Sequence, residues 1–338
     1  MVEKYLKSLL GPRASSRLLL LDSMQGMTML LVVVGHLAVV GMTPRWYELQ
    51  FHTFLYSFHM GVFVFISGYL IRVSYHGVDN LREYGVYIGK KLKKFLIPFL
   101  LIGGLGILLK MRLCGQSLDF KQYWSDLCVL LLRPRQSKVG YLWYIHLLFI
   151  FYLLSPLLFR LSRKIIWPLL LACAIMLAYF QPEWPYLNFN NFARYFIFYL
   201  SGVLAFEYRV FQRRWWKLCA VIAAIGFVIW TLLMLFWLPR WPEFIQGFLG
   251  ILVIALLATV LMKSQIVAAI LQLISMNCFA IYIFHMWIIN FCAAAYLKMN
   301  LLKRWGPYPY MITATVLGVL IPLAGCLLTQ RIRRLTNK

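Results

Sequence analysis

Three histidines lie inside long apolar segments of the sequence, where an ionisable side chain is costly to bury. His36 lies in LLLLDSMQGMTMLLVVVGHLAVVGM, His59 in FHTFLYSFHMGVFVFISGYLI and His285 in NCFAIYIFHMWIIN. A neutral imidazole can take the proton of a hydroxyl group, or it can accept an acyl group and pass it on. Because deep polar groups line cavities more often than they face lipid, we expect these histidines to mark a polar cavity.

The competing interpretation is structural. A lone histidine in a membrane helix often only bonds a neighbouring helix, an interaction worth about 0.6–2 kcal/mol. We favour that role for His52 and His146, which lie near the ends of their apolar segments. His52, Tyr56 and His59 follow helical spacing, so one face of that helix is polar.

The segments that hold these histidines belong to a membrane protein. Of the 338 residues, 62% are hydrophobic and 13% are charged, and the mean hydropathy is +0.77. No soluble core needs so much apolar surface. We predict an all-α fold, a polytopic membrane helical bundle of about ten transmembrane helices. Residues 1–338 are expected to form a single domain without a separate soluble domain. The predicted spans are 27–43, 52–74, 95–110, 140–160, 165–181, 192–208, 216–237, 243–262, 272–297 and 307–330.

The net charge of +24 indicates membrane topology rather than nucleic-acid binding. Lys and Arg lie in short clusters between the spans, as in cytoplasmic loops. We expect both termini to be cytoplasmic and no signal peptide to be removed. Loop 110–139 is predicted to be external although it carries six of these cations. It either holds an amphipathic segment that lies on the membrane surface or serves an anionic substrate.

Two polar residues, Asp22 and Gln25, lie just before the first predicted span. Gln25 precedes His36 by eleven residues, which is about 16 Å on one helix face. Asp22 is too far along the helix to bond His36, and we interpret it as a capping residue of a helix that begins near Gly26. In a span that begins at residue 27, His36 would lie about 14 Å deep.

Five segments, in this order, resemble the acyltransferase-3 family of integral-membrane O-acyltransferases. The family opens with an Arg or Lys followed by ten residues and a His, and Gln25 and His36 occupy these places. FVFISGYLI is similar to its SG segment, in which we interpret Ser67 and Gly68 as small residues that permit close helix approach. KKLKKFLIPF resembles its basic element. YLWYIHLLFIFYLLSP and IYIFH are similar to its later segments.

The resemblance implies transfer of an acyl group from cytoplasmic acyl-CoA, such as acetyl-CoA, to a hydroxyl of an envelope glycan or a lipid-linked sugar. It implies a location in the bacterial inner membrane. His36 would be the base or the acyl relay, with His59 and His285 in the same catalytic group. The implied cofactor-binding residues are Gln25, Arg72, Lys91 and Lys94, and the implied substrate-binding residues are Trp143, Tyr144 and Tyr282. No metal and no nucleic acid are expected, and the oligomeric state is left open.

The sequence departs from the family pattern at the first cation. Gln25 acts through hydrogen bonds, Arg17 or Arg72 supplies the charge, or the protein has lost its activity. Lys91 and Lys94 keep the charge of arginine but lose its bidentate geometry. They either bind CoA phosphates or only anchor a cytoplasmic loop. A transporter or flippase of glycan intermediates remains the alternative function, and an inactive membrane scaffold is the third.

Overall fold

The computed structural model describes residues 16–37, 42–113, 115, 119–160, 166–235 and 243–336, and in these ranges the chain is helical without any β-strand. Helices dominate because a backbone in lipid must satisfy its own hydrogen bonds. Seven described helical stretches are long and apolar enough to cross a membrane: Tyr47–Val73, Leu81–Leu113, Gly140–Arg160, Trp215–Leu232, Phe244–Leu261, Cys278–Lys298 and Pro307–Ile332. Leu19–Gly35, Ile166–Phe180 and Gln265–Met276 are shorter apolar helices. The prediction of an all-α polytopic membrane bundle is confirmed.

The first helix differs from its prediction at both ends. Helix α2 spans Ser16–Gly35 instead of 27–43, and residues 38–41 lie outside the described residues. Asp22 and Gly26 therefore lie within the helix, and the interpretation of Asp22 as a capping residue was wrong. His36 directly follows the last residue of α2 and does not lie in the middle of a helix, whereas its depth in the membrane stays a prediction.

Two later predictions of spans also need correction. The predicted span 272–297 is two helices, α13 (Gln265–Met276) and α14 (Cys278–Lys298), separated at Asn277. The Asn277 amide donates to the carbonyl of Leu273 at 2.8 Å, a local bond that competes with helix continuation. The predicted span 192–208 is helix α10 (Phe189–Glu207), which is not among the seven apolar stretches of the described chain.

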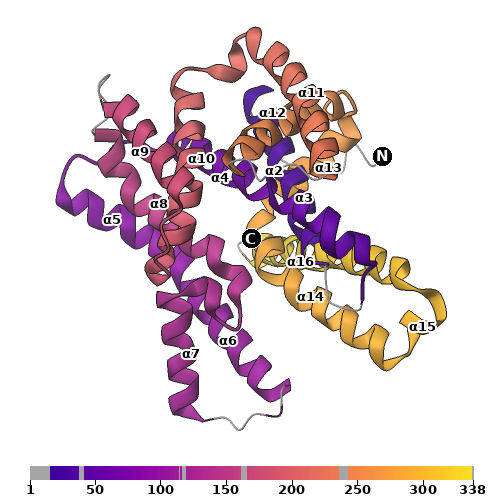
Figure 1. The fold of residues 1–338 in the computed structure, drawn as a ribbon. Coiled ribbons are helices and arrows are strands. Elements are labelled where there is room, and N and C mark those ends of the chain that lie inside the picture. The colour runs from indigo at the N-terminus through magenta and orange to yellow at the C-terminus, as the bar shows by residue number, and fades with distance from the viewer. Residues whose placement is uncertain are drawn as a thin grey trace. The chain divides into compact units, whose positions relative to one another are not determined.

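The chain forms two compact units, residues 1–66 with 209–338 and residues 67–208. In the first unit, α2 packs against α13, α14 and α12 (Glu243–Leu261), and α14 packs along α16 (Pro307–Thr336) (Figure 1). The buried core of α2 includes Leu21, Met24, Met29 and Val33. At Gly26 a Cβ atom would clash with the backbone of Leu271, so α2 and α13 touch along their backbones.

The second unit contains a helical hairpin of α6 (Ile97–Leu113) and α7 (Phe120–Leu132), which lie side by side (Figure 1). Leu130 packs against Gly103 of α6, and Tyr123 and Leu127 approach Gly104. The segment for which a surface-lying position was one of two alternatives therefore packs along another helix. The glycines of α6 permit this contact, because they leave room for the larger side chains of α7.

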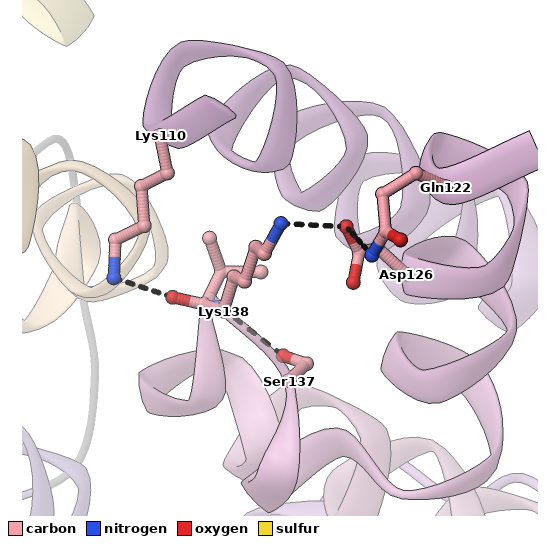
Figure 2. A network of polar contacts seen from close by, with 6 residues as sticks. Lys110, Gln122, Asp126, Ser137 and Lys138 are labelled. Carbon is pink, nitrogen blue, oxygen red and sulfur yellow. Dashed lines mark hydrogen bonds and ion pairs between the residues drawn. The ribbon is translucent and has the colours of Figure 1, made fainter. Parts of the chain in front are cut away.

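Two lysines near this hairpin form polar contacts within the second unit. Figure 2 shows the Lys138 ammonium 2.8 Å from the Asp126 carboxylate, and the Lys110 ammonium donating to the carbonyl of Lys138. Gln122 bonds the same carboxylate at 3.4 Å. These two lysines therefore hold the loop after α7 in place, whereas Lys121 is exposed.

Close helix contact also occurs at the SG pair. Helix α4 spans His59–Val73, and a Cβ atom at its Gly68 would clash with the carbonyl oxygen of Tyr199 in α10. Between membrane helices, small residues permit the close packing and polar contact that drive association. The interpretation of Gly68 as a residue that permits close approach is confirmed.

We predict that Gly68→Ala destabilises the protein by about 1–3 kcal/mol, because the added methyl group meets rigid backbone rather than a movable side chain. Gly89→Ala is the matched control, since Gly89 lies in a helix with open space around it. That change is expected to be neutral or to stabilise by up to about 1 kcal/mol. Thermal unfolding of the purified protein in detergent measures both, and equal unfolding temperatures would contradict the contact.

Candidate functional site

The membrane-crossing stretch Tyr47–Val73 is interrupted where its polar residues lie. It begins as a π-helical turn, Tyr47–Phe51, continues as α3 (His52–Tyr56) and is broken at residues 57–58 before α4 begins. Turns of π-helix are rare and are frequent at functional sites. The interruption lies between Tyr56 and His59, and His52 is the first residue of α3.

His36 and His285 lie side by side in the first unit. Their ring centroids are 5.1 Å apart with an interplanar angle of 44°. One ring follows the end of α2 and the other comes from the middle of α14, so residues distant in sequence converge. Tyr282, one turn before His285 on α14, has its ring 5.8 Å from the His285 ring. The structure thus brings together three of the residues predicted for the site.

Tyr56 joins the remaining histidines to this pair. Its hydroxyl lies 3.2 Å from Nδ1 of His36. Its ring stacks on His52 at 3.9 Å and meets His59 edge-on at 4.7 Å. The sequence places Tyr56 on the polar face of this segment but did not identify it as a site residue. Its spacing of four residues from His52 and three from His59 was the available signal. We call His36, His52, Tyr56, His59 and His285 the histidine cluster.

The ring orientations of the buried histidines are fixed by their own helices. Nδ1 of His59 donates to the Leu55 carbonyl at 2.6 Å, and Nδ1 of His285 donates to the Ile281 carbonyl at 3.0 Å. In a neutral ring, the proton is then on Nδ1 and the lone pair is on Nε2. His59 and His285 are 1% and 0% exposed, whereas His36 is partly exposed. His36 is thus the least buried of these three histidines.

Gln25 is engaged in a contact between α2 and α13. The Ser275 hydroxyl lies 2.8 Å from the Gln25 side-chain oxygen and 3.2 Å from a carboxylate oxygen of Asp22. Both residues therefore bind the last turn of α13. The Arg17 side chain, which the sequence offered as a substitute cation, lies outside the described residues.

The other predicted binding residues lie in the second unit. Arg72 forms an ion pair with Glu207, and its guanidinium lies 5.1 Å from the centroid of the Phe159 ring. The Lys91 ammonium lies 4.0 Å from the centroid of the Tyr152 ring, whereas Lys94 is exposed. These contacts neutralise or cover Arg72 and Lys91 and leave Lys94 accessible.

The two predicted aromatic residues of this unit differ in accessibility. Trp143 stacks on Tyr195 with ring centroids 5.4 Å apart. Tyr144 is buried and shares a hydrogen bond with Ser67. The substrate-binding role of both residues stays a prediction. Among the described residues, no three His, Cys, Asp or Glu side chains are grouped so that they could hold a metal ion.

The comparisons with known proteins bear on most of the chain. A family model described as an acyltransferase domain, of the acyltransferase-3 family, matches residues 19–327. No curated protein and no solved structure matches the chain. The match includes all five residues of the histidine cluster and all of the second unit. The chain therefore belongs to the acyltransferase-3 family and is a membrane acyltransferase.

Proposed function

We propose that this enzyme is an O-acetyltransferase that uses cytoplasmic acetyl-CoA, or another acyl-CoA, and acylates a hydroxyl of an envelope glycan or a lipid-linked sugar. The bacterial inner membrane is the matching location. The observation that carries this proposal is the histidine cluster. In it a partly exposed imidazole, His36, lies beside a second imidazole and is bonded to a tyrosine hydroxyl.

His36 can act in acyl transfer by two routes. As a base, it takes the acceptor hydroxyl proton while that oxygen attacks the thioester carbonyl, and CoA leaves as a thiolate that recovers the proton. As a relay, its nitrogen attacks the thioester carbonyl and CoA leaves as a thiolate. The acceptor hydroxyl then attacks the acyl-imidazole, the neutral imidazole leaves, and the hydroxyl proton passes to the CoA thiolate. If Nδ1 donates to the Tyr56 oxygen, the reactive lone pair is on Nε2 in both routes.

A transporter or flippase would use the same polar residues for passage without forming or breaking a bond. Membership of an acyltransferase family argues for chemistry instead. The contact of Gln25 with Ser275 supports the interpretation that this residue acts through hydrogen bonds. On the donor side we propose that the exposed Lys94 attracts CoA phosphates, with Lys91 positioned next to it by Tyr152.

His36→Ala is predicted to lower acyl transfer by about 10²-fold or more, because it removes either the proton acceptor or the acyl carrier. Acyl-CoA consumption by the purified protein measures the effect, and ester-linked acetyl groups on the glycans of a complemented deletion strain measure it in cells. His76→Ala is the control, since His76 lies outside the membrane-crossing stretches. Wild-type turnover in His36→Ala would remove His36 from the mechanism.

Tyr56→Phe is predicted to lower turnover about three- to tenfold while lowering the unfolding temperature no more than Tyr84→Phe does. It removes one hydrogen bond to His36, worth about 1 kcal/mol, but keeps the ring that packs on His52 and His59. Tyr84→Phe is the matched control, because it removes a hydroxyl bonded to the Leu153 carbonyl in the second unit. Equal turnover in the two variants would show that the Tyr56 hydroxyl does not position His36.

Lys94→Ala is predicted to raise KM for acyl-CoA several-fold at low salt with little change in kcat, because an exposed charge contributes to binding rather than to the transition state. Salt should reduce the difference, since exposed charges are screened. Lys121→Ala is the control from an exposed position on α7. Equal KM values for both variants would show that Lys94 does not bind acyl-CoA and only anchors its loop at the membrane.

A further inference from the structure

The second unit contains an apolar cavity of about 440 Å³ whose lining includes no residue of the histidine cluster. Its volume is within the range of small-molecule sites. Helix α8 (Trp143–Arg160) forms one wall, with Ile150, Leu153 and Leu154. The other walls include the end of α7 and the segment 184–192. Because this lining is almost wholly aliphatic and aromatic, an apolar chain fits it better than a polar molecule does.

Hydrogen bonds between the walls hold the cavity in shape. The His146 ring of α8 bonds the backbone of Leu131 in α7, which is the helix–helix role that the sequence favours for this histidine. Asn188 donates to the carbonyl of Trp143 at 2.8 Å, so the turn Tyr186–Asn188 is fixed to the start of α8. The cavity is therefore part of the folded unit and not a gap between loosely packed helices.

The cavity has an aromatic end and an aliphatic end. At the aromatic end, near the start of α8, Trp184 is 59% exposed and Tyr186 is 38% exposed. Exposed Trp and Tyr are typical of the level of the lipid head groups. From His146 at this end to Leu154 at the other, the α8 wall is about 12 Å long, close to the depth of one hydrocarbon leaflet, about 15 Å. These dimensions fit a lipid chain whose head group lies at the aromatic end.

Two arginines lie at the aromatic end. The Arg133 guanidinium is 4.2 Å from the centroid of the Tyr186 ring and donates to the Tyr186 hydroxyl. The Arg135 guanidinium is 5.9 Å from the centroid of the Trp143 ring and donates to the Asn191 side chain at 3.0 Å. Rings and neutral acceptors thus hold both side chains. In the part of the chain that the structure describes, neither guanidinium forms an ion pair, so both positive charges stay uncompensated.

Two lysines of the same loop are engaged differently. Lys138 forms an ion pair with Asp126, and Lys110 donates to a backbone carbonyl. The loop is predicted to be external, where an excess of cations is unusual. An anionic group bound at Arg133 and Arg135 would account for their uncompensated charge. Phosphate is the anion that best matches the planar guanidinium, because it accepts two parallel hydrogen bonds.

We propose that this corner of the second unit binds a phospholipid whose head group carries a net negative charge. One acyl chain lies in the cavity against Leu153 and Leu154, and the phosphate lies at Arg133 and Arg135. The lipid is a bound ligand and not an acyl acceptor, since no bond in it forms or breaks. The inference therefore does not depend on the proposed acyl transfer. It adds a dependence of the second unit on the lipid composition of its membrane.

Binding is tested with the purified full-length protein in phosphatidylcholine nanodiscs without acyl-CoA. The probe is a trace of phosphatidylglycerol with a photoreactive diazirine at the end of one acyl chain, and mass spectrometry locates the labelled peptides. We expect labelling of α8 and of segment 184–192. Phosphatidylcholine with the same diazirine is the control probe. It should label these peptides about tenfold less, because it has no net charge to attract to the two arginines.

A pair of double variants tests the head-group contacts. Arg133→Gln with Arg135→Gln should lower labelling by the phosphatidylglycerol probe to the level of the control probe. Arg112→Gln with Lys121→Gln is the matched control, because it removes two exposed charges of the same loop that lie in α6 and α7. Its labelling should equal that of the wild type. Equal loss of labelling in the two double variants would show a general attraction by the loop and would overturn the site.

A pair of tryptophan variants tests the cavity itself. Leu154→Trp fills it and should lower the labelling of α8 to the level of the control probe, whereas Leu157→Trp adds the same ring at an exposed position and should not. Equal labelling by the two probes, equal effects of the two tryptophans, or displacement by soluble glycerol phosphate as effective as by phosphatidylglycerol would each overturn the inference. The arginine and tryptophan tests use different residues, so one stays decisive if a variant of the other does not fold.

Discussion

The constraint on which this structure depends is that a polar side chain in lipid must find its hydrogen-bond partner inside the protein. Most such side chains here use the carbonyl one turn earlier in their own helix, as Thr28 does with Met24 at 2.7 Å. His59 and His285 follow the same rule. His36 does not, because its helix ends at Gly35 and its Nδ1 meets Tyr56 from another segment. The rule thus separates two histidines that are held by their own helices from one that is presented to a residue of another segment.

Close helix contact determines where that presentation occurs. Lipid supplies no hydrophobic force between helices, so packing and polar contacts must hold them together. Gly26 lets α2 touch α13, which brings Gln25 to Ser275. At the C-terminal end of α2, a Cβ atom at Gly35 would lie 3.1 Å from the Tyr56 ring. One glycine in the middle of α2 and one at its end therefore allow the two close contacts, the first beside Gln25 and the second beside His36.

The sequence predicts the fold class and the convergence of the three histidines because both follow from apolar length and from the cost of burying polar groups. It could not predict the start of α2, because Asp22 looks like a capping residue until Ser275 is known to bond it. The break at Asn277 depends on a side-chain bond within an apolar run. Tyr56 was missed because its segment is rich in aromatic residues, and the sequence does not show which of them contacts the histidine rings. In loop 110–139, packing of α7 depends on glycines of α6 that precede it in the chain.

The departure from the family pattern at Gln25 can be interpreted from its surroundings. Gln25 lies one turn after Asp22 on α2, and both contact Ser275. A cation at this position would lie within reach of the Asp22 carboxylate, whereas the glutamine shares the hydroxyl with it. Both arrangements lie in the middle of α2, eleven residues before His36. The glutamine therefore changes the charge about three turns away from His36, which contacts Tyr56 and His285. The proposed proton or acyl transfer at His36 does not involve a positive charge at residue 25. If residue 25 faces an anionic donor, the glutamine attracts it less strongly than a cation would.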